Sequence, residues 1–150
     1  MEACCRLNIG QKEVSEALLE GVVRRHKRED LVVVAQLLQI QIPDEKTTKL
    51  WMDVSGARIV ENWLKFDPKY SKLVLNSLLT MDAEILSYMA KDTTASRYLI
   101  EPLWEDTKAA KRLLTALEPH FRTLAVDRVG VFSVLKAFNQ MELAAKVSLV

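Results

Sequence analysis

The chain has few of the residues that build cofactor, metal and catalytic sites. Its 150 residues include only two cysteines and two histidines. Cys4 and Cys5 are adjacent, so they cannot form a disulfide framework or a Cys-x-x-Cys metal pair, and they fit a reducing compartment. His26 and His120 have no carboxylate or thiol at ligand or catalytic spacing. The four glycines are too scattered for a phosphate-binding loop. We therefore expect no cofactor, no metal, no small-molecule substrate and no enzymatic activity.

Long apolar runs and a surplus of charge are also missing. No apolar run approaches the ~18–20 residues of a transmembrane helix, and the first residues lack the basic-then-apolar order of a secretory signal, so we expect no membrane partner. With 49% hydrophobic and 27% charged residues the composition is globular. A formal net charge of +1 means that nucleic-acid binding would require the basic residues to gather on one face.

What the sequence does contain is a repeated motif. Three segments align without gaps, each with an aspartate, then a small residue three positions later, then two or more apolar residues: 53–61, 92–100 and 127–135. The small residues are Gly56, Ala95 and Gly130, which lie 39 and 35 positions apart. Recurrence at this period is typical of a solenoid, in which each unit buries its apolar face by stacking on the next.

The apolar spacing within each unit is helical. Adjacent apolar pairs recur one turn apart after each small residue, as in Ile59 and Val60 followed by Trp63 and Leu64. A short helix is expected before each motif, because Leu50, Met89 and Leu124 all lie three positions before the aspartate. A third helix is expected after each motif, over residues 68–79, 107–117 and from 141 onward. Two further helices are predicted over 12–25 and 30–41.

Start signals support these boundaries. Asp67 before Pro68, and Asp106, are typical N-caps, and the motif aspartates Asp53, Asp92 and Asp127 are expected to cap the turn before each middle helix. Pro102 lies inside the second middle helix, where its missing N–H predicts a kink or a loosened turn.

A three-helix unit whose middle helix opens with Asp-x-x-Gly-x-x-Val-Val-(Gln/Glu) resembles the Pumilio (PUF) repeat. The resemblance implies an all-α, right-handed α-solenoid, with repeats at 44–80, 81–117 and 118–150 and an N-terminal cap or atypical repeat at 1–43. The DVSGAR and DTTASR forms are most similar to the branch typified by nucleolar protein nine. That similarity implies single-stranded, pre-ribosomal RNA as partner, together with ribosome-assembly proteins, in the nucleus and nucleolus, with the cytoplasm as the alternative.

The resemblance also implies which positions face RNA. In the family, the residues one and five after the small residue contact the base edge, and the residue two after it stacks on base faces. Carried over to this chain, the RNA-facing residues are Ala57, Arg58, Glu61, Ser96, Arg97, Ile100, Val131, Phe132 and Leu135.

The side chains at these positions predict stacking with little edge recognition. Arg58, Arg97 and Phe132 are planar, and such groups stack on any base. Ile100 and Leu135 offer no donor or acceptor. Only Glu61 would read an edge, favouring the N–H groups of guanine. We therefore expect weak sequence preference, with the first unit preferring guanine.

Other interpretations of the same residues remain open. Arg58 and Arg97 are equally explained as solvated surface charges, and Phe132 as a core residue with the register displaced by one. A HEAT or armadillo-type protein-interaction scaffold has an overlapping period. Exposure of Ile100 and Leu135 would favour the Pumilio surface, whereas their burial would indicate a wrong register.

Three smaller features complete the sequence. The basic run at 24–28 is either a phosphate-contacting or nuclear-targeting patch or a helix end whose charge complements the dipole, and we favour the helix end. Trp51, Trp63 and Trp104 have core spacing. The apolar segment ending at Val150 predicts association or fraying there, as in a fragment of a longer array.

Overall fold

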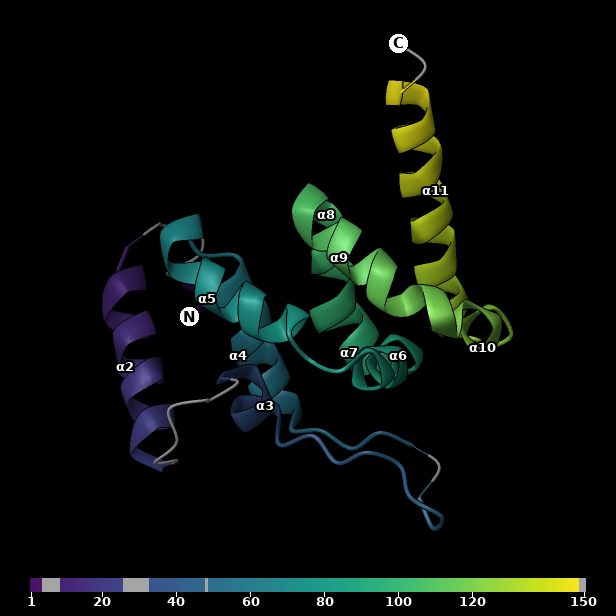
Figure 1. Ribbon diagram of the computed structural model, residues 1–150. Helices are drawn as coiled ribbons and strands as arrows, with labels where there is room; N and C mark the ends of the chain where they lie inside the picture. The colour runs from purple at the N-terminus through teal and green to yellow at the C-terminus, as the bar shows by residue number, and fades with distance from the viewer. Residues whose placement is uncertain (4–8, 26–32, 48, 149–150) are drawn as a thin grey trace. The chain divides into compact units, whose positions relative to one another are not determined.

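The computed structural model describes residues 1–3, 9–25, 33–47 and 49–148, with side chains described only outside 23–25 and 142–148. The chain divides into two compact units, Met1–Met81 and Asp82–Val150. Helices dominate both units (Figure 1), and the described residues form no strand beyond an isolated bridge between Gln41 and Trp51. No helix in the described part of the chain is both long and apolar enough to cross a bilayer. The basic run and the apolar C-terminal end fall largely on side chains outside this description.

Among its described residues, the first unit contains the helices α2 (Gln11–Arg25), α3 (Val33–Leu38), α4 (Val54–Leu64) and α5 (Pro68–Leu79). Its core consists of fully buried apolar side chains from α3, α4 and α5, among them Leu38, Val60, Trp63 and Leu78. The indole N–H of Trp63 donates to the carbonyl of Tyr70 at 3.1 Å, which joins α4 to α5. The predicted N-terminal helices, middle helix and third helix of this unit are therefore present.

Polar contacts tie the N-terminal helices to the rest of the first unit. The side-chain oxygen of Gln11 accepts a hydrogen bond from the backbone N–H of Asp67 at 2.9 Å, across 56 positions of sequence. The backbone N–H of Val34 donates to the hydroxyl of Ser77 at 3.2 Å. Gln11 of α2 and Val34 of α3 are thus bonded to residues at the start of α5 and within it.

The short helix expected before Asp53 does not form. Instead Gln41 and Trp51 exchange backbone hydrogen bonds of 2.9 and 3.1 Å, and the described residues between them form an extended hairpin that projects from the unit (Figure 1). The expectation that Trp51 is a core residue was also wrong, because half of its surface is exposed. The position of the missing helix is taken by α3, whose residue Leu37 approaches Gly56 of α4 through its backbone.

The second unit contains two motif repeats. The first comprises α6 (Ala83–Lys91), then α7 (Thr93–Ala95), η1 (Ser96–Ile100) and α8 (Glu101–Glu105) in one continuous helical segment, then α9 (Thr107–Leu117). The second comprises η2 (Glu118–His120), α10 (Phe121–Ala125) and α11 (Gly130–Ser148). Fully buried leucines from successive helices form the core: Leu86, Leu99, Leu103, Leu113, Leu117 and Leu124.

Two departures from regular helix geometry occur in this unit. Residues 96–100 form a π-helical turn immediately before Pro102, which confirms the expected disturbance of that helix. The separate helix expected from Met141 onward is absent, because α11 continues without a break from Gly130 to Ser148. No glycine or proline interrupts the sequence between 131 and 148, so nothing in it ends the helix.

Candidate nucleic-acid interface

Each motif aspartate caps the helix that presents the candidate RNA-facing residues. Asp53 Oδ1 accepts from the N–H of Gly56 at 2.6 Å, and Asp92 Oδ1 accepts from the N–H of Ala95 at 2.8 Å. Asp127 Oδ1 accepts from the N–H of Gly130 at 2.8 Å. The bond joins the aspartate to the small residue three positions later in all three repeats, which confirms the predicted caps. These caps fix where each middle helix starts and hence which residues follow on its surface.

In the first unit, the three candidate positions differ in accessibility. Ala57 is fully buried and is not available to a base. Arg58 is exposed, as a stacking residue must be. The carboxylate of Glu61 is paired with Lys65, with 3.0 Å between Oε1 and Nζ, and 21% of its side chain is exposed. A guanine edge would therefore compete with Lys65 for Glu61.

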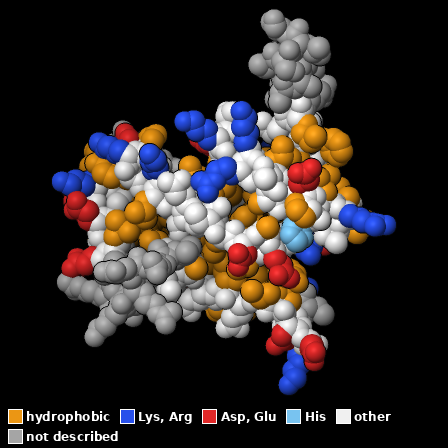
Figure 2. Space-filling view, in the orientation of Figure 1, with side chains coloured by type: hydrophobic (Ala, Val, Ile, Leu, Met, Phe, Trp, Pro, Cys, Tyr) orange, Lys and Arg blue, Asp and Glu red, His pale blue; other side chains and the backbone are white. Residues whose placement is uncertain are grey.

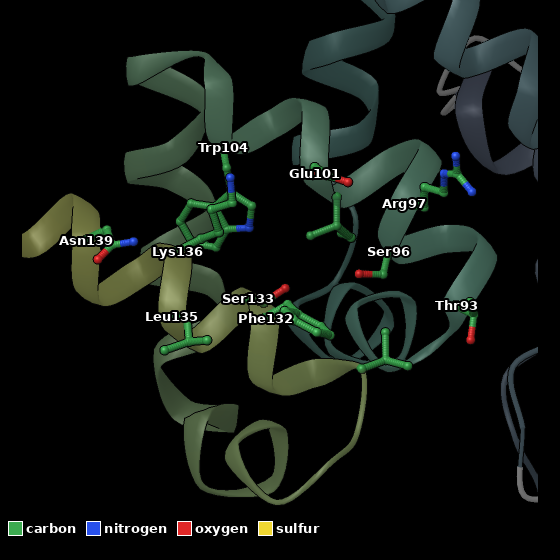
Figure 3. Close-up of a pocket in the computed structure, with 12 residues that line it drawn as sticks. Thr93, Ser96, Arg97, Glu101, Trp104, Phe132, Ser133, Leu135, Lys136 and Asn139 are labelled. Carbon is green, nitrogen blue, oxygen red and sulfur yellow. The ribbon is translucent and has the colours of Figure 1, made fainter.

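In the second unit, residues from two separate repeats meet at one groove with a volume of about 510 Å³ (Figure 3). Five of the six sequence-predicted residues of this unit line it: Ser96, Arg97, Ile100, Phe132 and Leu135. The sixth, Val131, is partly buried and does not line the groove. Segments 35 positions apart in sequence thus place their candidate residues at the same surface.

The exposure of these residues separates the alternative registers. Phe132 is 64% exposed and Leu135 is 54% exposed, whereas Ser133 is buried, so Phe132 is a surface residue and the displaced register does not apply to this helix. Ile100, at the same motif position as Leu135, is only 1% exposed. The exposure of Leu135 therefore favours the Pumilio surface on α11. The burial of Ile100 does not favour it on the middle helix of the second repeat.

Arg97 lies at the margin of the groove. Figure 3 shows its guanidinium pointing away from the hollow in which Phe132 lies. Its Cζ is 5.8 Å from the centre of the Tyr98 ring, within the range of a cation–π contact. The planar guanidinium is therefore supported by a neighbouring ring and exposed on its outer side.

Seven residues that line the groove were not among the predicted positions: Thr93, Glu101, Trp104, Val129, Ser133, Lys136 and Asn139. Trp104 and Lys136 lie one turn beyond Ile100 and Phe132, and Asn139 follows Lys136 on the same face of α11. Extending each predicted stripe by one helical turn would have found them. Glu101 also lines the groove, although it lies one position after the predicted Ile100. The buried indole N–H of Trp104 has no hydrogen-bond partner among the described residues.

Charge at the groove is mixed. Arg97 and Lys136 contribute two cations, and Glu101 contributes one anion. Figure 2 likewise shows Lys and Arg side chains beside Asp and Glu side chains and exposed hydrophobic surface on the viewed face. The segregation of basic residues that a strongly electrostatic interface requires is not visible there, so stacking must contribute more than charge to any binding of RNA.

Together, the capped middle helices and the shared groove define a helical-repeat protein of the PUF class. The profile of the NOP9-like PUF repeat domain matches residues 1–147, and the chain belongs to this family. The predicted resemblance to the Pumilio repeat and its nucleolar branch is thereby confirmed.

Individual relatives agree with the family. Pumilio homolog 23 of Arabidopsis thaliana is 28% identical over 151 residues, covering 94% of this chain and 20% of the relative. Nucleolar protein 9 of Schizosaccharomyces pombe is 32% identical over 102 residues, covering 65% of this chain and 15% of the relative. The chain thus spans a fifth or less of the length of these two proteins.

Solved structures show the same fold. The structure of APUM23 with GGAGUUGACGG matches with a TM-score of 0.72 and 27% identity, covering 92% of this chain and 28% of that chain. An APUM23 structure lacking the insert region, with GGAAUUGACGG, matches with a TM-score of 0.73 and 27% identity, covering 93% and 29%. These matches confirm the all-α solenoid fold class and do not favour the HEAT or armadillo alternative.

Proposed function

We infer that this chain is an RNA-binding part of a ribosome-biogenesis protein. It acts in the nucleolus on single-stranded, pre-ribosomal RNA. It works beside ribosome-assembly proteins, as a binding protein and not as an enzyme. Its family and the RNA-bound structures of APUM23 support this proposal. The single observation that supports it best is the groove, where Phe132 presents an exposed ring among residues from two repeats.

The mechanism follows from the side chains at the surface. Phe132 stacks on one base, while Arg58 and Arg97 present planar cations at the matching positions of the other two repeats. Stacking contributes about 1–3 kcal/mol per base and tolerates every base. Leu135 has no hydrogen-bonding group, so the third repeat holds a base without reading its edge. Lys136 supplies a cation for the backbone beside that base.

The test compares two phenylalanines of one helix. Phe132 lines the groove and Phe138 does not, yet they are 64% and 62% exposed on α11. Fluorescence anisotropy with labelled single-stranded GGAGUUGACGG should show that Phe132→Ala weakens binding about ten-fold, since one stacked base is lost. Phe138→Ala removes the same ring and should leave binding unchanged. Equal effects of the two substitutions, or no binding by the wild type, would refute the proposal.

A second arm of the same titration examines the arginines. Arg58→Ala/Arg97→Ala removes two cations from the predicted surface, and Lys72→Ala/Arg112→Ala removes two exposed cations from α5 and α9. Both pairs change the net charge equally. The arginine pair should weaken binding by at least ten-fold more than its control, and the difference should persist at higher salt because stacking is less screened than charge.

A further inference from the structure

The middle helix of the second repeat holds one more residue in its first turns than the other two middle helices. The backbone N–H of Glu101 donates to the carbonyl of Ser96, five residues back, where an α-helix would use the residue four back. One extra residue rotates every later side chain by about 100° around the helix axis. After this turn, a residue a given number of positions after Ala95 therefore no longer lies on the same side of its helix as the residue the same number of positions after Gly56 or Gly130.

Burial reveals the displacement directly. Five residues after the small residue, the regular helices α4 and α11 have Glu61, whose side chain is 21% exposed, and Leu135, which is 54% exposed. In the second repeat the fifth residue is Ile100, which is 1% exposed, and the sixth is Glu101, which is exposed and lines the groove. Glu101 therefore occupies the place on the surface that the fifth residue occupies in the neighbouring repeats.

The core shows the same displacement by one residue. Seven positions after the small residue, α4 and α11 bury Trp63 and Ala137 completely. In the second repeat the corresponding buried residue is Leu103, eight positions after Ala95. Both the buried and the exposed sides of this helix are thus shifted in the same direction.

Pro102 explains why the turn is widened at this point. It has no N–H to donate to the carbonyl of Tyr98, four residues back, and in a regular helix its ring would collide with that carbonyl. The π turn at residues 96–100 lies directly before it. The extra residue is therefore coupled to a proline that the other two repeats lack in their middle helices.

We propose that Glu101, and not Ile100, is the base-edge residue of the second repeat, and that with Ser96 it selects guanine; this proposal rests on the RNA-binding function inferred above. Guanine presents two adjacent donors, N1–H and the N2 amino group, which the two oxygens of one carboxylate can accept together. Adenine, uracil and cytosine present no such pair. In Figure 3 the hydroxyl of Ser96 points toward the hollow, and Glu101 lines the groove from the same continuous helical segment.

The state of Glu101 suits this role better than that of Glu61. Among the ion pairs of the described residues, Glu61 is bound to Lys65. Glu101 takes part in none of those pairs, so its carboxylate is available to a base. The groove around it is closed on one side by Ile100 and Trp104, which are nearly buried, and a hydrogen bond formed there is partly shielded from water.

The test uses single-guanine probes and a matched glutamate. Labelled UUUGUUU and UUUAUUU are titrated with the whole chain carrying Glu61→Gln, so that the first repeat has no carboxylate. This parent should prefer the guanine probe about ten-fold. Adding Glu101→Gln should bring the ratio close to one. Adding Glu105→Gln, which removes the same charge from an exposed residue of α8 outside the groove, should leave it near ten.

The outcomes separate this proposal from the function on which it rests. A guanine preference that survives Glu101→Gln, or falls equally with Glu105→Gln, overturns the assignment of Glu101. A parent that binds both probes equally also overturns it, while RNA binding itself stands. A parent that binds neither probe, nor GGAGUUGACGG, overturns both proposals.

Discussion

Replacing Gly56 with alanine tests how closely α4 packs against α3. A Cβ built on Gly56 would overlap the carbonyl oxygen of Leu37 and lie 2.8 Å from its carbonyl carbon. These are backbone atoms, which cannot rotate away as a side chain can. A Cβ built on Gly21 of α2, by contrast, meets nothing within 4 Å. Both glycines lie in helices of the first unit, so they form a matched pair.

The two substitutions should change stability in opposite directions. Alanine is favoured over glycine in a helix by about 1 kcal/mol, and Gly21→Ala should gain most of that. Gly56→Ala gains the same term but forces two helices apart, and overpacking costs about 1–3 kcal/mol or more. Because the obstacle is backbone, we expect the upper part of that range and a net loss of about 2 kcal/mol. For a chain of this size this lowers the Tm by about 4–8 °C.

Urea denaturation followed by circular dichroism measures both free energies of unfolding. Gly130→Ala provides an intermediate case, since its added Cβ would lie 2.9 Å from both the side chain and the carbonyl oxygen of Leu124. The expected order of stability is Gly21→Ala, wild type, Gly130→Ala, Gly56→Ala. If Gly56→Ala were as stable as Gly21→Ala, the close approach of α3 to α4 would be refuted.

Two further predictions concern hydrogen bonds. Trp104→Phe should cost about 1–2 kcal/mol less than Trp63→Phe in urea denaturation, because only the indole of Trp63 has a partner among the described residues, and equal losses would contradict this. The pKa of Asp44 is lowered below its ordinary value by hydrogen bonds to its carboxylate. The largest contribution comes from the hydroxyl of Thr47, and smaller ones come from backbone N–H groups. The contribution of this turn to stability is therefore present above the ordinary pKa and is lost as the pH falls through the lowered one. An NMR titration should show that Thr47→Val raises the pKa of Asp44, and an unchanged value would exclude the hydroxyl as its cause.

Local signals predicted the caps and most helices. Asp92 and Asp127 accept hydrogen bonds from the N–H groups two and three residues later, and Asp53 from the N–H three residues later, so neighbours in sequence are enough to form these caps. The same holds for Asp67 and Asp106 at the starts of α5 and α9. Errors arose where the expectation came from analogy between repeats. The helix expected near Leu50 rested on alignment with other repeats, whereas Gln41 and Trp51 are instead paired by two backbone hydrogen bonds.

Sequence by itself determined the repeat, the helical class and the planar residues Arg58, Arg97 and Phe132, because spacing and side-chain chemistry are local properties. Tertiary structure alone decided which position of each helix meets solvent. Ile100 and Leu135 occupy the same motif position, but one is buried and the other exposed. The π turn before Pro102 adds one residue to the helix, so every later residue faces a different side. Which of those residues meets solvent is decided only when the helix packs against its neighbours.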